Sequence, residues 1–438
     1  MKKLESAPLW YKEPLYTESL KLSKSDEVTA MIDKINDGYL YWDKVKHYDA
    51  GIRPDQLWAR VKASRVINAK KLAFGSHKFL FNLTNTIQKQ LHEFDLHIGG
   101  NLGANRIIPE ADKKRYLVSS IMEEAIASSQ IEGAVTTRKK AKEMLRKSAK
   151  PRNTSEQMIL NNYITINHIV KEKDDQLTLD KLFEIHRLIV KDTMDEEQDE
   201  GRFRDNNDIR IVDSTDGEVV HFPPDHSLLK ILMAELIDFC NDKHDEQFIH
   251  PIIKGCIIHF MIGYIHPFVD GNGRTARALF YWYLLKKGYW LTVYLSISRL
   301  IYKSKVKYAK AFLYTETDDN DLTYFIAYKL NVMQMSFKEL KDYIQRKMDE
   351  KRQMSDFQKI RGINERQATI LKWISEDPDS LLTVKELENR LLISNQTART
   401  DLEGLVKMGY LEVIELNRKM KGFCKSENFD QLLNKHLS

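Results

Sequence analysis

Residues 251–277 constrain the fold of this chain more than any other stretch. The run PIIKGCIIHFMIGYI (Pro251–Ile265) is apolar on nearly every side of a helix, which predicts a buried helix. The peptide HPFVDGNGRTAR (His266–Arg277) follows directly, and its two glycines and its asparagine favour a turn with left-handed residues. A second helical pattern then runs to Gly288, a typical residue after a helix C-cap. We therefore expect two helices joined by a tight glycine loop.

This loop combines groups that suit a bound phosphate. Backbone N–H groups of a glycine-rich turn and of a helix N-terminus form a nest for anions. Arg274 and Arg277 lie three residues apart, so both face one side of the second helix and can contact the same polyphosphate. Asp270 offers a hard oxygen ligand for Mg²⁺. His266 ordinarily titrates near neutral pH, which suits a general base.

Two familiar nucleotide-binding loops do not explain the peptide. A Walker A loop needs Gly-Lys followed by Ser or Thr, and a dinucleotide-binding fingerprint needs a preceding strand. Taken singly, Asp-Gly is usually a turn and an arginine at a helix start is usually solvated. Their combination in this order points to a phosphate site.

The peptide resembles the signature of Fic-domain enzymes, HPFx[D/E]GNGRxxR. It matches the signature at each of the nine specified positions, namely His266, Pro267, Phe268, Asp270, Gly271, Asn272, Gly273, Arg274 and Arg277. The resemblance implies a mainly helical bundle with a β-hairpin flap. It also implies transfer of AMP from ATP to a Ser, Thr or Tyr hydroxyl of a target protein, which is the usual activity of the family.

The resemblance also implies the role of each residue in that reaction. His266 would deprotonate the target hydroxyl, and Asp270 would hold Mg²⁺ on the ATP phosphates. Phe268 would anchor the loop inward. The remaining residues would bind the nucleotide: the α-phosphate would lie against Gly271, Asn272 and Gly273, the β-phosphate against Arg274 and the γ-phosphate against Arg277.

A β-hairpin is predicted within the otherwise helical region. Two β-prone runs, Ile209–Val212 and Val219–Phe222, flank the turn sequence DSTDG. The hairpin resembles the family's flap (about 205–224), which would dock a target segment as an added strand through Val219, Val220, His221 and Phe222. A plain surface hairpin remains the alternative. Tyr308 resembles a tyrosine on the adenine side of the family's nucleotide site.

A second motif lies upstream in SSQIEG, at the end of an apolar-periodic helix (about 116–133). Alone, it reads as an ordinary helix C-terminus with Gly133 as the stop. Beside the signature it resembles the inhibitory motif [S/T]xxxE[G/N], matched by Ser128, Glu132 and Gly133. The resemblance implies that Glu132 pairs with Arg277, blocks the γ-phosphate position and makes the protein autoinhibited.

The C-terminal part has the plan of a winged helix. Helices are predicted at Arg366–Ser375, Val384–Leu391 and Asn395–Met408, followed by two strands around a basic turn. Early residues of the third helix could contact bases. However, residues 346–438 contain 17 Lys and Arg against 15 Asp and Glu, which is not a phosphate-seeking surface. DNA binding and protein docking both stay open.

The predicted organisation follows from these elements. It comprises an N-terminal helical region (1–80), a Fic region (81–345), a charged helical linker (346–363) and a winged-helix domain (364–438). The fold class is mainly α. No signal peptide is visible, and the longest apolar run is too short to span a bilayer. Three widely spaced cysteines fit a reducing compartment, so we expect a cytoplasmic protein without membrane contact.

The expected function is a self-inhibited protein adenylyltransferase that uses ATP and Mg²⁺ and acts on an unknown target protein. One alternative is a DNA-binding transcriptional regulator whose Fic domain senses nucleotide. Another is removal of AMP or transfer of a different nucleotide, because the loop recognises phosphate rather than base. A homodimer also stays open.

Overall fold

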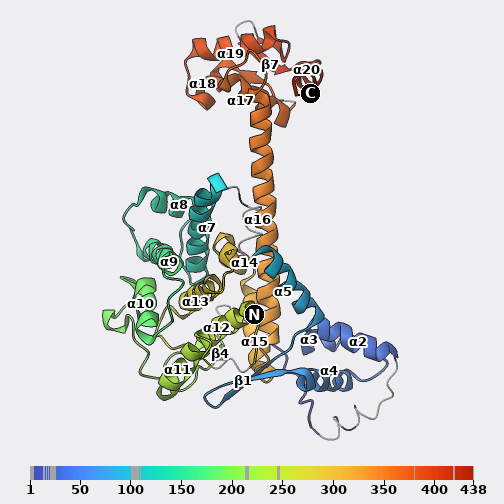
Figure 1. The fold of residues 1–438 in the computed structure, drawn as a ribbon, viewed down its shortest axis with the longest axis vertical. Coiled ribbons are helices and arrows are strands. Elements are labelled where there is room, and N and C mark those ends of the chain that lie inside the picture. Colours follow the sequence, from blue (N-terminus) through green and yellow to red (C-terminus); the bar gives the residue numbers. More distant parts are fainter. Residues whose placement is uncertain are drawn as a thin grey trace. The chain divides into compact units, whose positions relative to one another are not determined.

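The computed structural model describes residues 4–12, 15, 17, 19, 26–99, 108, 110–212, 217–243, 247–378, 380–417 and 420–437 (Figure 1). The chain divides into two compact units, Met1–Leu340 and Lys341–Ser438. Both are rich in helix, as the sequence predicted. Among the described residues, no helix combines the length and the apolar character that crossing a membrane requires.

Helices make up most of the first unit. They are α2 (Asp26–Asp37), α3 (Trp42–Val45), α4 (Pro54–Asn68), α5 (Asn85–His97), α7 (Glu110–Ile131), α8 (Arg138–Lys147), α9 (Thr154–Lys171), α10 (Leu179–Val190), α11 (Leu229–Cys240), α12 (Pro251–Ile265), α13 (Asn272–Lys286), α14 (Ile297–Lys303), α15 (Lys305–Thr317) and α16 (Thr323–Gln358), with short 3₁₀ helices η1 (Glu197–Asp199), η2 (His226–Leu228) and η3 (Trp290–Tyr294). Helix α16 starts in this unit and ends in the second, so much of the predicted linker is helical.

The core of the first unit is built around α12 and α13. Every residue of α12 from Ile252 to Ile262 is buried, as its apolar sequence predicted. Gly255 lets the two helices approach closely, because a Cβ at this position would lie 3.2 Å from Cδ2 of Leu284 on α13. On another side of α12, the Phe260 ring stacks on Phe312 of α15 with centroids 5.2 Å apart. The helix that ends at the glycine loop is thus held on several sides.

Two antiparallel hairpins accompany these helices. Strand β3 (Ile211–Val212) pairs with β4 (Val219–His221) where the sequence predicted a hairpin, although the turn residues 213–216 lie outside the described part. The second hairpin, β1 (Lys70–Phe74) with β2 (His77–Phe81), was not predicted, so the expectation of one hairpin was wrong. Its turn contains Gly75, whose φ of +55° is a conformation that glycine adopts without strain.

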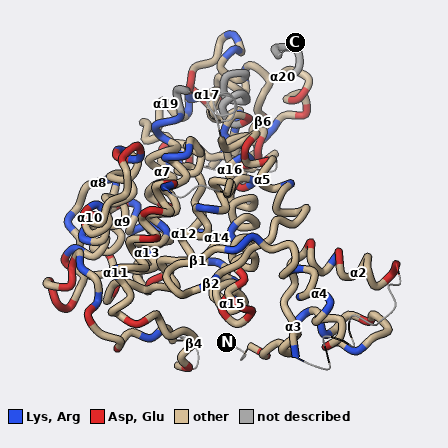
Figure 2. The backbone as a smooth tube through the Cα atoms, turned by 60° about the horizontal axis from the view of Figure 1, so that its bottom comes forward, with Lys and Arg blue, Asp and Glu red and all other residues tan. Residues whose placement is uncertain are grey.

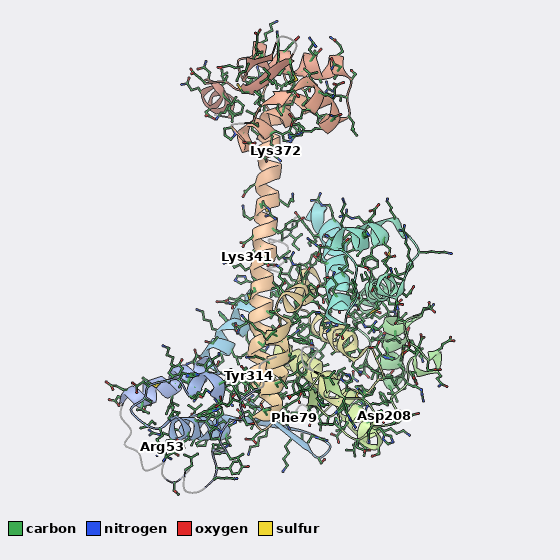
Figure 3. The ribbon with its side chains drawn as sticks, turned by 180° about the vertical axis from the view of Figure 1, so that it is seen from behind. Arg53, Phe79, Asp208, Tyr314, Lys341 and Lys372 are labelled. Carbon is green, nitrogen blue, oxygen red and sulfur yellow. The ribbon has the colours of Figure 1, made fainter. Side chains whose placement is uncertain are left out.

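Residues from the N-terminal region pack onto α15 and α16. Tyr314 of α15, labelled in Figure 3, stacks on Tyr41 with ring centroids 4.6 Å apart. The buried Arg65 guanidinium lies 4.1 Å from the centroid of the Tyr39 ring and donates to the hydroxyl of Tyr324 on α16 at 2.6 Å. This aromatic cluster fixes the N-terminal helices to the rest of the unit.

The second unit is the predicted winged helix. It contains α17 (Glu365–Glu376), β5 (Leu382–Thr383), α18 (Val384–Leu391), α19 (Asn395–Lys407), β6 (Leu411–Asn417), β7 (Met420–Lys425) and α20 (Phe429–Leu437). The antiparallel sheet has the order β5-β7-β6. Strand β5 and helix α20 were not predicted. The buried Asp401 of α19 accepts hydrogen bonds from Arg366 Nε at 2.6 Å and from Asn364 Nδ2 at 2.8 Å, which ties α19 to the start of α17.

Charged residues of both signs occur along the backbone of each unit (Figure 2). This mixture agrees with the small net charge of +5.

The packing of α12 predicts a large cost for truncating Phe260. Phe260→Ala leaves a cavity between α12 and α15, and we expect it to lower the free energy of unfolding by about 3–5 kcal/mol. Phe222→Ala is the control, because this ring is 68% exposed and its removal should change stability by less than about 0.5 kcal/mol. Denaturant titration of the full chain measures both. Equal effects would contradict the core assignment.

Candidate active site

The glycine loop begins and ends with left-handed residues. His266 caps α12 with φ +48°, and its N–H donates to the Ile262 carbonyl at 3.0 Å. Gly271 precedes α13 with φ +82° and provides no side-chain cap. The first N–H groups of α13 therefore point out of the helix without intrahelical partners. This end of α13 can bind an anion, as the sequence predicted.

The side chain of Asn272 closes the loop. Its Oδ1 accepts from the Phe268 N–H at 2.9 Å, and its Nδ2 donates to the Phe268 carbonyl at 2.8 Å. Phe268 is fully buried and stacks on the ring of His186 with centroids 3.8 Å apart. Asn272 thus uses its side chain to shape the loop, and its backbone N–H, at the first position of α13, has no intrahelical acceptor.

Helix α10 packs against the loop through His186 and Val190. The Gly201 N–H donates to Nδ1 of His186 at 3.0 Å, so Nε2 carries the proton and donates to the Asp270 carbonyl at 2.9 Å. Burial lowers the pKa of His186 to about 4, which keeps this neutral arrangement. Position 271 lies so close to α10 that a Cβ there would come within 2.6 Å of Cγ1 of Val190. Glycine is required at 271 by both conformation and space.

Arg204 joins the loop to the base of the hairpin. Its side-chain Nε donates to the His266 carbonyl at 2.9 Å, and its backbone N–H donates to the Pro267 carbonyl at 2.9 Å. The same guanidinium donates to the Pro224 carbonyl just after β4. The buried Arg204 side chain therefore links the backbone of His266 to the end of the hairpin.

His266 is arranged to accept a proton. Its Nδ1 lies 3.1 Å from the Gly263 carbonyl, an acceptor, so Nδ1 carries the hydrogen and Nε2 keeps its lone pair. Burial lowers the pKa of His266 below its ordinary value of 6.5. The imidazole is therefore neutral at physiological pH.

The two arginines of α13 contact different parts of the protein. Nη1 of Arg274 donates to the Ile189 carbonyl at 3.0 Å, and its Nη2 donates to Asp270 Oδ2 at 2.8 Å. Nε of Arg277 donates to Ser128 Oγ at 2.8 Å. Among the described residues, Nε of Arg274 and Nη1 of Arg277 are buried without a hydrogen-bond partner. Buried cationic donors of this kind fit an anionic ligand. The Asp270 carboxylate is half exposed and accessible to a cation.

The pairing of Glu132 with Arg277 is present. Oε1 of Glu132 accepts from Arg277 Nη2 at 2.8 Å. The carboxylate also lies directly against Gly273, because a Cβ at 273 would be only 2.2 Å from Oε1. Glu132 therefore occupies space at the N-terminus of α13, beside the second arginine of the signature.

The end of α7 that carries Glu132 is held in place. Gly133 follows with φ +96° and ends the helix. Lys305, at the start of α15, donates to the carbonyls of Gln130 and Ile131 at 3.0 and 3.3 Å. A lysine at a helix C-terminus is electrostatically favourable.

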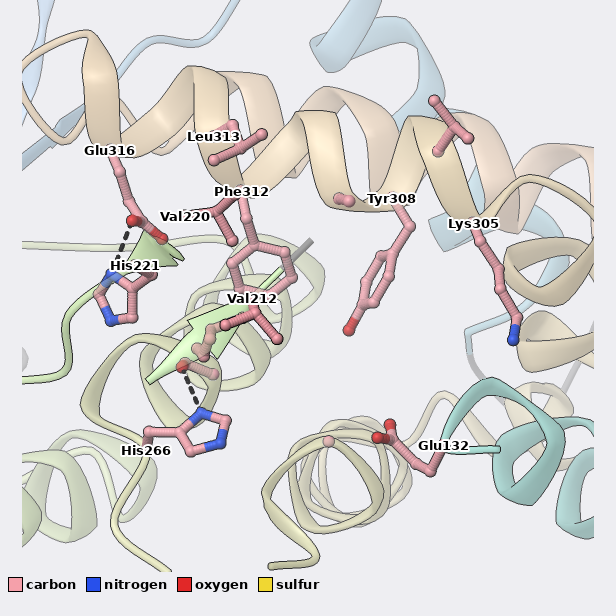
Figure 4. Close-up of a pocket in the computed structure, with 15 residues that line it drawn as sticks. Glu132, Val212, Val220, His221, His266, Lys305, Tyr308, Phe312, Leu313 and Glu316 are labelled. Carbon is pink, nitrogen blue, oxygen red and sulfur yellow. Dashed lines mark hydrogen bonds and ion pairs between the residues drawn. The ribbon is translucent and has the colours of Figure 1, made fainter. Parts of the chain in front are cut away.

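A cavity of about 330 Å³ adjoins these groups. In Figure 4, side chains of α15 point into it from one side, and His266 and Glu132 face them from the other. It is lined by Glu132, Ile211, Val212, Val220, His221, Gly263, His266, Gly273, Lys305, Val306, Tyr308, Ala309, Phe312, Leu313 and Glu316. The wall formed by the hairpin and α15 is largely apolar, which suits a planar aromatic ring such as a nucleobase.

Tyr308 lies at this cavity, and its hydroxyl contacts Nε2 of His259 at 2.8 Å. His259 is fully buried in α12, as expected for a core histidine, and burial lowers its pKa. Burial raises the pKa of Tyr308, so the phenol stays protonated.

The hairpin residues assigned to docking point in different directions. Val219 is 38% and Phe222 68% exposed, and Val220 lines the cavity. His221 instead turns inward. Its Nδ1 lies 2.7 Å from Glu316 Oε2, and its Nε2 lies 2.8 Å from the Tyr264 carbonyl. Both partners are acceptors, so both ring nitrogens donate and the imidazole is a cation. Its side chain holds the hairpin and is not free to contact a docked strand.

Four residues of the site were not predicted from the sequence, namely His186, Arg204, Lys305 and Glu316. Each acts on a partner distant in the chain; the His186–Asp270 contact, for example, joins residues 84 positions apart. No spacing rule in a single sequence signals such a contact.

Comparison with known proteins agrees with this geometry. Residues 176–284, which include the loop, match the Fic/DOC family, and residues 361–417 match the MarR family. The chain carries a Fic domain. A MarR-type winged-helix domain follows it in the second unit.

Curated relatives of the Fic domain are named "Protein adenylyltransferase Fic". The protein from Nematostella vectensis is 33% identical over 124 residues, which is 28% of this chain and 26% of that protein. The protein from Aedes aegypti is 35% identical over 124 residues, covering 28% and 23% of the two chains. The chain thus spans about a quarter of the length of these relatives.

Among solved structures, a Fic family protein from Desulfovibrio desulfuricans G20 superposes with a TM-score of 0.47 and 20% identity. The match covers 78% of this chain and 94% of that one.

The His221–Glu316 pair predicts how firmly the hairpin is held. Glu316→Ala removes the acceptor of Nδ1, and trypsin should then cut after the exposed Arg210 roughly fivefold faster or more. Glu316→Gln keeps an acceptor, so its rate of cleavage after Arg210 should lie between those of the parent and Glu316→Ala. Cleavage after the exposed Arg152 serves as the internal reference.

The same contact should depend on pH. Burial alone would lower the pKa of His221, but the hydrogen bond to Glu316, the charge of that carboxylate and the hydrogen bond to the Tyr264 carbonyl together outweigh burial, and the pKa lies above 6.5. A raised pKa gives stabilisation that is complete below 6.5 and lost as pH rises through the folded value. Protection of Arg210 should therefore fall at alkaline pH in the parent and change little in Glu316→Ala. Protection that rises with pH would contradict this assignment.

Proposed function

We propose that this protein is an adenylyltransferase that moves AMP from ATP to a hydroxyl of a target protein and that Glu132 restrains it. The observation that carries the proposal is the position of Glu132. Its carboxylate binds Arg277 at 2.8 Å and lies against Gly273, on the cavity that His266 also faces. The names of the Fic relatives support the same reaction.

His266 would act as the general base. Its Nε2 accepts the proton of the target hydroxyl while the hydroxyl oxygen attacks the α-phosphorus of ATP. The bond from the α-phosphorus to the bridging oxygen breaks, and pyrophosphate leaves. The Nδ1 hydrogen bond to Gly263 holds the imidazole in the tautomer that this step needs.

The N-terminus of α13 would bind the phosphates. The N–H groups of Asn272 and Gly273 surround the α-phosphate, and Gly271 allows its close approach. Arg274 binds the β-phosphate and Arg277 the γ-phosphate, which offsets the charge that develops on the leaving pyrophosphate. Asp270, half exposed at the mouth of the loop, is the carboxylate that would hold Mg²⁺. The ion supplies positive charge to the phosphates when bound. Tyr308 and the apolar wall of α15 would contact the adenine.

Restraint follows from competition for Arg277. While Ser128 occupies Nε of Arg277 and Glu132 occupies Nη2, only Nη1 is left for the γ-phosphate, and the Glu132 carboxylate repels the phosphates. ATP that binds in this state lies with its α-phosphorus out of line for attack. Gly133 and Lys305 keep the end of α7 in this position.

The MarR match favours a second function, regulation of transcription with the Fic domain as a nucleotide sensor. Helix α19 exposes Asn395, Gln396 and Arg399 near its N-terminus, where base contacts fall in such domains. Sequence-specific binding of duplex DNA by the full chain, together with no transfer of label from ATP, would favour this function over the first.

Glu132→Gly tests the restraint. The substitution frees Arg277, so AMP transfer from α-labelled ATP should rise by roughly tenfold or more over the parent. Mass spectrometry of the labelled protein, whether this chain or a lysate protein, locates the modified hydroxyl. Glu132→Gln, which keeps the shape but not the charge, should give an intermediate rate.

The double variant Glu132→Gly/His266→Ala is the control. It should transfer AMP about 10²–10⁴-fold more slowly than Glu132→Gly because the base is missing. Equal activity of the parent and Glu132→Gly would show that Glu132 does not restrain the enzyme, and full activity of the double variant would remove His266 from the reaction.

The pH profile tests the base independently. Protonated His266 cannot accept a proton, so activity falls as pH drops through its pKa. Burial places that pKa below 6.5, and in Glu132→Gly the nearby carboxylate that raises it is gone. The acidic limb of kcat/KM for Glu132→Gly should therefore lie below pH 6.5. A limb at or above 6.5 would mean that another group accepts the proton.

A further inference from the structure

Positive charge is concentrated in α8 and the residues directly after it. Residues 138–152 contain eight Lys and Arg and one acid, Glu143, a net charge of +7. The whole chain has a net charge of +5, so the remainder of the chain carries −2. We name the exposed basic residues of this segment the α8 surface; they are Arg138, Lys139, Lys140, Arg146, Lys147, Lys150 and Arg152.

The helix presents this charge to solvent because its other face is apolar. Ala141, Met144 and Leu145 are buried in a cluster with Met122 and Ile126 of α7. The fold therefore needs the apolar face of α8, and it places no requirement on the charge of the opposite face.

Helix stability does not explain the basic residues at the start of α8. Its first turn contains Arg138, Lys139 and Lys140 and no acid. The helix dipole favours acidic side chains at this end and disfavours basic ones. Thr137 caps the helix by accepting from the Lys140 N–H, so the start is otherwise well formed.

Ion pairs within the protein neutralise only part of the surface. Arg138 contacts Glu123, and Lys147 contacts Glu143. Among the described residues, Lys139, Lys140 and Arg146 have no acidic partner within salt-bridge distance, and neither do Lys150 and Arg152. These five cations remain available to a ligand.

The α8 surface begins close to the candidate active site. Arg138 follows Glu132 by six residues, so their Cα atoms are separated by at most about 20 Å. The connecting segment exposes 86% of Val135. A protein that offered a hydroxyl to the cavity could therefore reach α8 with a neighbouring segment.

We propose that the α8 surface docks an acidic segment of the protein that receives AMP. The proposal rests on the proposed function for the nature of the partner, and on charge complementarity for its chemistry. No aromatic side chain lies between residues 138 and 152, so the surface has no platform for stacking bases. An acidic polypeptide therefore fits it better than a nucleic acid.

A binding assay with the full chain tests the surface. The probe is a fluorescein-labelled oligoglutamate peptide, followed by fluorescence anisotropy. Lys139→Glu/Lys140→Glu/Arg146→Glu should bind the peptide about tenfold more weakly than the parent or worse. The peptide affinity of Lys139→Gln/Lys140→Gln/Arg146→Gln should lie between those of the parent and the triple Glu variant. Affinity of the parent should fall between about 0.05 and 0.2 M salt.

The matched control is Lys89→Glu/Lys230→Glu/Lys338→Glu. These lysines are exposed on other helices, so the change in net charge is the same while the α8 surface is intact. Binding by the control should stay within about twofold of the parent. Equal losses in both triple variants would reduce the effect to net charge and overturn the proposal, as would unchanged binding in the α8 variant.

A labelled DNA duplex of arbitrary sequence serves as the second probe. If the α8 variant loses affinity for the duplex and keeps it for oligoglutamate, the partner is a nucleic acid and the proposal is wrong. Neither measurement uses ATP or catalysis. Failure of AMP transfer by Glu132→Gly would therefore overturn the proposed function and leave the binding result intact. Failure of peptide binding would overturn the role of the α8 surface and leave the proposed function intact.

Discussion

The hydrogen bonds between Asn272 and the backbone of Phe268 hold the candidate active site together. They close the loop between α12 and α13 and bury the Phe268 ring against His186. With the loop closed, the backbone of His266 meets Arg204, and Gly273 in the first turn of α13 lines the cavity. His266, the N-terminus of α13 and the end of the hairpin are thus positioned by one turn, which tolerates only glycine at 271.

Arg277 connects two opposing requirements on this site. The arginine is buried, and a buried guanidinium needs a counter-charge. In the resting protein Glu132 supplies it, and in the proposed reaction a phosphate does. Because one cation serves both partners, restraint and chemistry exclude each other without a large rearrangement of the fold. The short distance from Glu132 to Gly273 makes the exclusion steric as well as electrostatic.

The sequence predicted best those features that neighbouring residues determine. Helices α12 and α18 have the predicted bounds, since apolar periodicity, caps and glycine stops are local signals. The Glu132–Arg277 pair was predicted only through family resemblance, because its residues lie 145 positions apart. The β1–β2 hairpin was missed because lysines interrupt its apolar pattern. His186 and Glu316 were missed since their importance comes from contacts that only the folded chain creates.

The close contact at Gly273 also has a consequence for how such a sequence can drift. While Glu132 is present, any side chain at 273 would displace its carboxylate, so under the proposed function the pressures for restraint and for phosphate binding would both act on this one residue. A descendant that lost Glu132 would keep only the second of these pressures. Positions 132 and 273 are far apart in the sequence, yet the proposed function couples what each can tolerate, since the loss of Glu132 removes the steric constraint on residue 273 and leaves that of phosphate binding.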